Sequence, residues 1–266
     1  MNKKHIAFIY EGEKAEHALI SNLCRNFFES QANTVIIPFP ASGNIYMLWS
    51  RLKEDHFETE VIDVVREMSP EASKILKNVR TSDFSEIYLF FDYDAHNHNI
   101  PKEYLNCDIV MEMLSTFDNE TELGKLYISY PMIESLREIS IETENYVTLS
   151  VSVDNDKICR NGHKGYKNYV SVYRDYQNFS SITLSRWEIA CRASVLRSNL
   201  IVQDTEAFPN YHEFICNLTQ EHIYQSQMQN FVLPKQEVGV LNSVPLFLLE
   251  YFNETFWNHL MYSKQN

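Results

Sequence analysis

The stretch Glu86-Ile87-Tyr88-Leu89-Phe90-Phe91-Asp92-Tyr93-Asp94 decides the fold. Its apolar and aromatic run stops at two aspartates one residue apart, which is typical of a buried parallel strand ending at a sheet edge. In open α/β sheets, ligands bind outside the carboxyl ends of the strands. Neighbouring carboxylates repel each other unless a cation or proton lies between them, and Mg²⁺ prefers oxygen ligands. Asp92 and Asp94 therefore indicate a Mg²⁺ site facing a phosphate; the alternative is a solvated turn.

A second apolar run ends in the same way near the start of the chain. Lys4-His5-Ile6-Ala7-Phe8-Ile9-Tyr10 is followed directly by Glu11-Gly12, and a helical pattern then begins. Glu11 is a candidate general base or acid, or a further metal ligand. The alternative is an acid that the helix N-terminus favours, and Glu13 and Glu16 fit that alternative better. Glu16 is kept as a candidate metal ligand.

The order of the patterns predicts an α/β fold with a parallel, Rossmann-like sheet in the N-terminal half. Strands are expected near 5–10, 34–38, 86–91 and 125–129, with helices at about 13–29, 44–54, 58–78 and 103–117. Right-handed crossovers would bring the carboxyl ends of these strands to one edge. After a period-two stretch at 146–153, helical patterns run over about 166–177, 183–200, 207–229 and 236–260. We therefore divide the chain into a catalytic domain at 1–150 and a mostly helical region at 151–266 packed on it.

Composition excludes several classes of protein. The 266 residues are 44% hydrophobic, which suffices for a substantial core, and only six are glycine. No Gly-x-x-x-x-Gly-Lys-Ser/Thr occurs, so any nucleotide switch must lie on a partner. The five cysteines are scattered and form no Cys-x-x-Cys, which favours reduced thiols in the cytoplasm. No stretch approaches the roughly 20 apolar residues of a membrane span.

The net charge of −13 argues against a free nucleic-acid binder, because such affinity comes from Lys and Arg meeting phosphates. The most basic local segment is Arg160–Lys167, which is either a phosphate-holding loop or a loop with solvated lysines. Glu134, after Tyr130-Pro131, either completes an acid cluster or serves the first turn of a helix. His96 and His98 fit an exposed loop better than a transition-metal site. The candidate substrate contacts are Lys14, His96, Tyr130, Lys164 and Lys167.

An aromatic stripe near the C-terminus has two readings, a core face or an interface for another chain. Core is the simpler of the two. The stripe comprises Phe247, Leu248, Tyr251, Phe252, Phe256 and Trp257.

Glu11-Gly12 after a first strand and Asp92-Tyr93-Asp94 after a later one resemble the Toprim domain of topoisomerases, primases, OLD nucleases and phage-defence nucleases. The likeness covers roughly the first half of the chain. The segments 125–134 and 240–249 resemble small defence Toprim proteins of the PARIS and AbiL kind. This resemblance implies a Toprim catalytic domain, Mg²⁺ or Mn²⁺ as cofactor, and an ABC- or OLD-type ATPase partner encoded nearby.

The expected function is thus a metal-dependent nuclease, the toxic effector of abortive infection. Catalysis is expected of Glu11, Asp92, Asp94 and Glu134, and metal binding of Glu11, Asp92, Asp94 and Glu16. The PARIS likeness implies host tRNA as target, whereas the OLD likeness implies DNA. We also allow for a homo-oligomer. The alternative is a non-catalytic Toprim-fold scaffold whose acidic surface binds a protein partner.

Overall fold

The computed structural model describes residues 3–93, 108–139, 150–152, 159–160, 163–171 and 176–262, without the side chains of 159–160, 163–164 and 261–262. Contacts divide the chain into two compact units. The first comprises Met1–Tyr127 with Phe179–Ser181, and the second Ile128–Asn178 with Ile182–Asn266. This division falls inside a strand, between Tyr127 and Ile128, whereas the sequence-based boundary was placed at residue 150.

The first unit is built on an α/β alternation. Its elements are β1 (Lys4–Tyr10), α1 (Ala15–Phe27), β2 (Thr34–Pro40), α2 (Ile45–Glu54), α3 (Val61–Met68), α4 (Pro70–Ile75), the 3-10 helix η1 (Thr81–Asp83), β3 (Phe84–Asp92), α5 (Ile109–Thr116), β4 (Asp118–Asn119), β5 (Gly124–Ser129), which continues into the second unit, and the 3-10 helix η5 (Phe179–Ser181). The five-stranded sheet has the order β2-β1-β3-β5-β4. Strand β1 is parallel to both β2 and β3, and the short β4 is antiparallel to β5.

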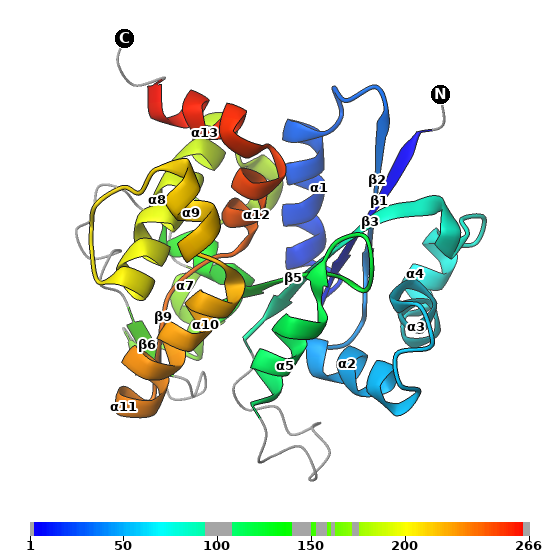
Figure 1. Cartoon of the computed structure of the whole chain (residues 1–266), viewed down its shortest axis with the longest axis horizontal. Helices are drawn as coiled ribbons and strands as arrows, with labels where there is room; N and C mark the ends of the chain where they lie inside the picture. Colours follow the sequence, from blue (N-terminus) through cyan, green and yellow to red (C-terminus); the bar gives the residue numbers. More distant parts are fainter. Residues whose placement is uncertain are drawn as a thin grey trace. The chain divides into compact units, whose positions relative to one another are not determined.

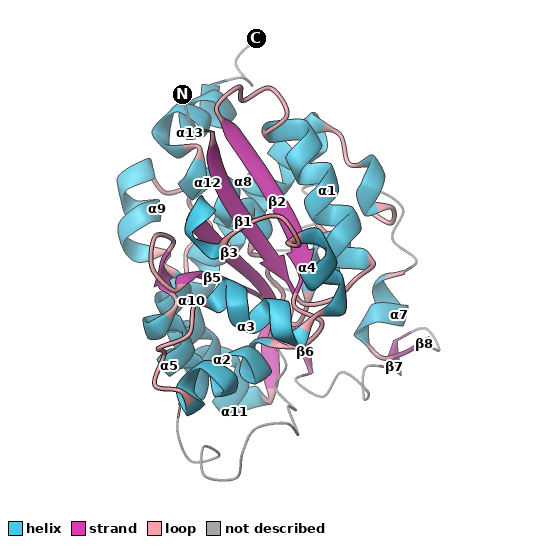
Figure 2. Cartoon of the chain, turned by 90° about the vertical axis from the view of Figure 1, so that its right-hand side faces the viewer, coloured by secondary structure: helices cyan, strands magenta, loops and turns pink. Residues whose placement is uncertain are grey.

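Helices cover both faces of this sheet, with α1 on one side and α3 and α4 on the other (Figure 1). Figure 2 shows β2, β1 and β3 lying side by side. After α1 the chain enters β2 on one side of β1, and it later crosses back to place β3 on the other side. The carboxyl ends of β1 and β3 therefore flank the topological switch point, where the chain changes the direction in which it adds strands. Ligands bind at such points in open α/β sheets.

The core explains why β1 is central. Residues Ile6–Tyr10 are all fully buried, and so nearly is the run Ile87–Phe91 of β3. The Phe8 ring meets Phe28, Tyr88 and Phe90 edge-on, with centroids 5.5, 5.8 and 5.5 Å away. Such edge-to-face contacts between rings add to the stabilisation from burial. The aromatic run at 86–91 therefore forms a buried strand, as the sequence predicts.

The second unit is mostly helical. Its elements are the 3-10 helix η3 (Ile133–Glu138), β6 (Ser150–Ser152), β7 (Cys159–Arg160), β8 (His163–Lys164), α7 (Tyr166–Val170), α8 (Leu184–Gln203), α9 (Tyr211–Asn217), α10 (Gln220–Gln227), the π-helix η6 (Met228–Val232), α11 (Leu233–Lys235), β9 (Glu237–Gly239), α12 (Val244–Tyr251) and α13 (Asn253–Tyr262). Short strands pair as β6 with β9 and β7 with β8. Half of the aromatic stripe is core, since Phe247, Leu248 and Trp257 are buried, while the other three residues are half-buried.

The α/β first half with a mostly parallel sheet and the helical second half are confirmed, but four predicted helices differ in detail. Of the helix expected at 166–177, the structure describes α7 (Tyr166–Val170) as helical and 176–178 as non-helical. The pattern at 58–78 forms two helices, because Ser69 accepts the Ala72 amide and Pro70 starts a new helix. The pattern at 207–229 also forms two helices, α9 and α10. Thr219 caps the start of α10 by accepting a hydrogen bond from the His222 amide. The segment 236–260 begins as strand β9 rather than as helix. No helix in the described part of the chain combines the length and apolar character needed to cross a membrane.

Replacing Phe8 by Ala tests the core. We expect Phe8→Ala to lower the free energy of unfolding by about 3–5 kcal/mol, because it removes a fully buried ring surrounded by three others. Met47→Ala, at a side chain 39% exposed, should change it by less than about 1 kcal/mol. Urea denaturation measures both. Equal effects of the two substitutions would show that β1 is not the centre of the core.

Candidate functional site

Two acidic residues lie at the carboxyl ends of neighbouring parallel strands. Tyr10 of β1 is level with Phe90 of β3, so Glu11 follows β1 one residue beyond this pair and Asp92 ends β3 two residues beyond it. Adjacent strands run roughly 4.8 Å apart. Both acids are half-buried. The convergence expected from the sequence therefore holds for the backbone positions of Glu11 and Asp92.

The Glu16 side chain folds back over the turn that follows Glu11. A Cβ atom built on Gly12 would lie 2.8 Å from Glu16 Oε2 and 3.1 Å from Oε1, closer than real Cβ contacts allow. Gly12 thus leaves the space that the Glu16 carboxylate occupies. Although Glu16 lies in the first turn of α1, where the helix dipole favours an acid, its carboxylate also faces the Glu-Gly turn.

A pair of hydroxyl groups lies near Glu13, Ser42 from the loop after β2 and Ser69 from the junction of α3 and α4. Ser42 Oγ lies 2.8 Å from Ser69 Oγ and donates to Glu13 Oε1 at 3.4 Å. Ser42 has a φ of 55°, a left-handed conformation that is unusual for a residue with a side chain. Strained backbone of this kind gathers at functional sites. Sequence patterns gave no reason to single out Ser42 or Ser69.

The electrostatics of the end of β1 are strongly negative. Burial raises the pKa of the Tyr10 phenol well above its usual range, and the Cys24 thiol and the carboxylates of Glu16, Glu71 and Glu13 raise it further. Tyr10 therefore keeps its proton at neutral pH, and its hydroxyl lies 2.7 Å from His17 Nδ1. Burial, the largest of these causes, disfavours any charge, whereas the carboxylates of Glu16, Glu71 and Glu13 favour a cation.

These observations bear on whether a metal would fit. Among the described side chains no group of three or more His, Cys, Asp or Glu has a geometry suited to a metal, while Asp94 lies outside the described residues. Mg²⁺ needs fewer protein ligands than that, since it is usually held by one or two carboxylates together with waters and substrate phosphates. Glu11 and Asp92, with Glu16 beside the turn, supply suitable oxygen donors.

The remaining residues expected at the site lie at the start of α1, in the second unit, or outside the described residues. His96 and His98 lie outside the described residues, as does the side chain of Lys164, whose backbone belongs to β8. Lys14 precedes α1 and is exposed. Tyr130, Glu134 and Lys167 belong to the second unit.

Within the second unit, two segments distant in sequence are joined around Tyr130. The Tyr130 amide donates to the Leu241 carbonyl at 2.7 Å, and the Leu241 amide donates back at 2.9 Å. The Ser129 and Ser243 hydroxyls lie 3.1 Å apart, and Asn242 Nδ2 donates to the Ile133 carbonyl at 2.8 Å. The Tyr130–Pro131 peptide bond is cis. The segments 125–134 and 240–249, singled out separately in the sequence, thus form one hydrogen-bonded structure.

Glu134 is 1% exposed, and its Oε1 lies 2.7 Å from the Lys167 ammonium. Nearby, the buried Glu138 accepts a hydrogen bond from the Tyr166 hydroxyl. An isolated buried carboxylate is costly, so Lys167 stabilises Glu134. This ion pair gives both residues a structural role, beside the catalytic and substrate-binding roles expected from the sequence.

Comparison of the chain with known protein families, curated proteins and solved structures gives no significant match.

Raising the pH tests the buried phenol next to Asp92. Burial, with the Asp108 carboxylate, raises the pKa of Tyr93 from 10.0 to about 12. Because the folded-state pKa is the higher one, the stabilisation is complete below pH 10 and is lost as the pH rises toward 12. We expect the free energy of unfolding to fall by up to about 1.4 kcal/mol per pH unit in this window. Urea denaturation should show a shallower fall in Tyr93→Phe; parallel curves would contradict the assignment.

The Glu134–Lys167 pair is tested by a double-mutant cycle. Lys167→Ala leaves the Glu134 carboxylate buried without its cation, and we expect a loss of about 1–3 kcal/mol of stability near neutral pH. Adding Glu134→Gln should restore part of that loss, because the uncompensated charge is then gone. If Lys167→Ala is neutral in chemical denaturation, the pair contributes nothing structural.

Proposed function

We propose that this chain is a metal-dependent phosphodiester hydrolase, a nuclease of the Toprim type. The observation that carries the proposal is the place of Glu11 and Asp92. They follow the two parallel strands that flank the switch point of the sheet, where α/β proteins bind their ligands. The negative field around Tyr10 supports a cation there.

Glu11, Asp92 and Asp94 would hold Mg²⁺ or Mn²⁺, with Glu16 as a further ligand. When bound, such an ion polarises a phosphoryl oxygen and lowers the pKa of a water molecule. Glu11 is positioned by the fully buried strand that precedes it and would orient the attacking water or take its proton. Gly12, which has no side chain, allows the backbone to come close to a phosphate.

The first turn of α1 adds to the suitability of this edge for a phosphate. The Lys14 side chain makes no capping hydrogen bond, and backbone N–H groups at a helix start attract anions. Glu13 and Glu16 lie in the same region, so a phosphate would approach only when cations offset these carboxylates. A metal-bridged contact with the substrate meets that requirement.

The biological role rests on the likeness to small defence proteins. It comprises a toxic effector of abortive infection, held or triggered by an ABC- or OLD-type ATPase encoded nearby, acting on host tRNA or on DNA in the cytoplasm. The absence of a phosphate-binding glycine loop in the sequence supports an external nucleotide switch. Glu134, Tyr130, Lys164, Lys167, Lys14 and His96 remain candidates for catalysis or substrate contact.

A second candidate function is a non-catalytic scaffold whose acidic surface binds a basic partner. The observation that favours it is the net charge of −13. A scaffold would not need Asp92 for a response to metal. The response of the melting temperature to Mg²⁺ therefore separates the two functions.

The proposal is tested by expressing the chain, alone and with its genomic neighbour, in growing cells. We expect growth arrest with a discrete cleavage product in total RNA or plasmid DNA. Glu11→Gln and Asp92→Asn should each reduce cleavage at least about 100-fold, because they remove a charge needed at the reacting phosphate. The gel that carries the product identifies the substrate class.

The matched control is Glu67→Gln, which removes a carboxylate that is 67% exposed and ion-paired with Arg51. It should cleave like the unchanged chain. Mg²⁺ or Mn²⁺ should raise the melting temperature of the unchanged chain and of Glu67→Gln, but not of Asp92→Asn. Intact nucleic acid and equal growth in every case, also under phage challenge, would favour the scaffold.

A further inference from the structure

A pocket in the first unit lies where the chain passes from α4 to β3. It has a volume of about 500 Å³ and is lined by Arg66, Ser73, Leu76, Lys77, Val79, Arg80 and Thr81. Three of these seven side chains are cationic and none is acidic. In a chain of net charge −13, such a lining is unusual.

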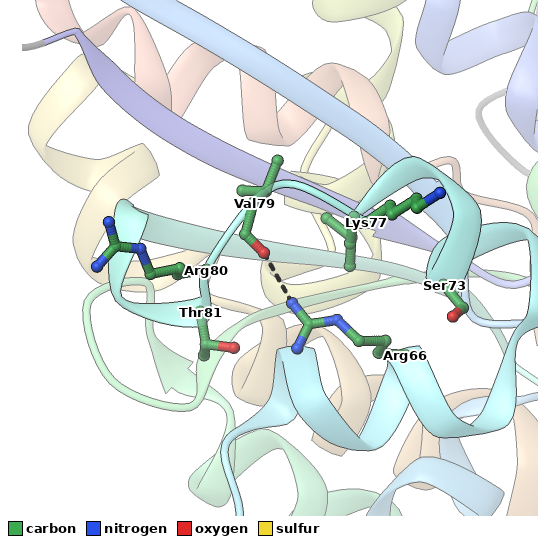
Figure 3. Close-up of a pocket in the computed structure, with 7 residues that line it drawn as sticks. Arg66, Ser73, Lys77, Val79, Arg80 and Thr81 are labelled. Atoms are coloured by element: carbon green, nitrogen blue, oxygen red, sulfur yellow. Dashed lines mark hydrogen bonds between the residues drawn. The ribbon is translucent and has the colours of Figure 1, made fainter.

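Arg66 is held in place at the centre of this pocket (Figure 3). One of its terminal nitrogens donates to the Val79 carbonyl at 3.0 Å, and the other donates to Asp63. Asp63 also accepts from the Thr81 hydroxyl at 2.7 Å. A guanidinium has five N–H donors in a rigid plane, so donors remain for a ligand after these two contacts.

Lys77 and Arg80 lie on either side of Arg66 in Figure 3, with side chains that extend in opposite directions. Both residues are exposed. Neither side chain forms an ion pair with any residue that the structure describes, whereas Lys74 pairs with Glu71 and Arg51 with Glu67. Asp63 offsets Arg66, and the Asp83 carboxylate accepts the Arg80 amide at 2.9 Å, so the pocket is less positive than its three cations alone would make it.

The pocket residues lie outside the candidate site, although the Ser73 amide donates to the carbonyl of Ser69 at 2.9 Å, one helical turn from the Ser42–Ser69 contact. The opposite end of the pocket, at Thr81, is far from Asp92. Thr81 precedes β3 by way of η1, and Asp92 is the last residue of β3. A strand rises about 3.3 Å per residue, so the two ends of β3 are on the order of 25 Å apart. A ligand in the pocket would therefore not touch Glu11 or Asp92 unless it were a long polymer.

We propose that this pocket binds a phosphate group, either of a free nucleotide or of a nucleic-acid backbone. The fixed Arg66 guanidinium suits the acceptor oxygens of one phosphate, and Lys77 and Arg80, which extend in opposite directions, each offer a cation to a neighbouring anionic group at a different rim. Ser73 adds a hydroxyl to the lining. The inference uses residues outside the candidate site and does not depend on the proposed hydrolase activity.

The test measures the affinity of the full chain for inorganic phosphate, AMP and a short single-stranded RNA at constant ionic strength, by calorimetry or amide chemical shifts. The variant is Lys77→Ala/Arg80→Ala, since Arg66→Ala would also remove structural hydrogen bonds. We expect about three- to tenfold weaker binding, as for the loss of two exposed ion pairs. Lys74→Ala, which removes a lysine of α4 that does not line the pocket, should bind like the unchanged chain.

The three ligands separate the sources of phosphate. If RNA binds more tightly than AMP and the double variant weakens it, the pocket holds a nucleic-acid backbone. If AMP is weakened while RNA is unaffected, the pocket holds a free nucleotide. The inference is overturned if the unchanged chain binds none of the three at millimolar concentration, or if the double variant binds all of them as well as the unchanged chain.

Discussion

The parallel pairing of β1 with β3 is the constraint on which the rest of this molecule depends. Parallel strands end at the same edge, so the register that sets Tyr10 beside Phe90 also brings Glu11 and Asp92 to neighbouring strand ends. The pairing is stabilised by apolar burial, with Phe8 at its centre among three other rings. Hydrophobic burial thus contributes the free energy that holds like charges near one another.

Several acidic residues lie near one edge of the sheet, and their mutual repulsion has to be offset by cations or protons. Glu13, Glu16 and Glu71 all act on the buried Tyr10 phenol, which burial and these charges keep protonated. A cation bound at this edge would stabilise the folded chain, and this would link stability to function in the proposed hydrolase. The buried acids of the second unit are stabilised by neighbouring side chains instead. Lys167 forms an ion pair with Glu134, and the Tyr166 hydroxyl donates a hydrogen bond to Glu138.

Local patterns were sufficient to predict the main strands of the sheet, because a buried strand is a continuous apolar run whose end is marked by a polar residue. The break at Ser69-Pro70 was missed when 58–78 was predicted as one helix, although Ser is a good N-cap and Pro suits the first helical position. Strand β9 was not, because its partner β6 lies far away in sequence and three residues carry little pattern. The Glu134–Lys167 pair and the Ser42–Ser69 contact arise from tertiary packing, which no local spacing encodes.

A metal site between the ends of β1 and β3 is tested most simply by locating a bound divalent cation, without relying on activity. Mn²⁺ titrated into isotopically labelled protein broadens the amide signals of nearby residues. If the metal binds there, we expect selective broadening at Gly12, at Asp92 and at the first turn of α1. Excess Mg²⁺ should suppress this broadening. Broadening centred on other carboxylates, or none at concentrations that saturate ordinary Mg²⁺ enzymes, would contradict a metal site between the ends of β1 and β3.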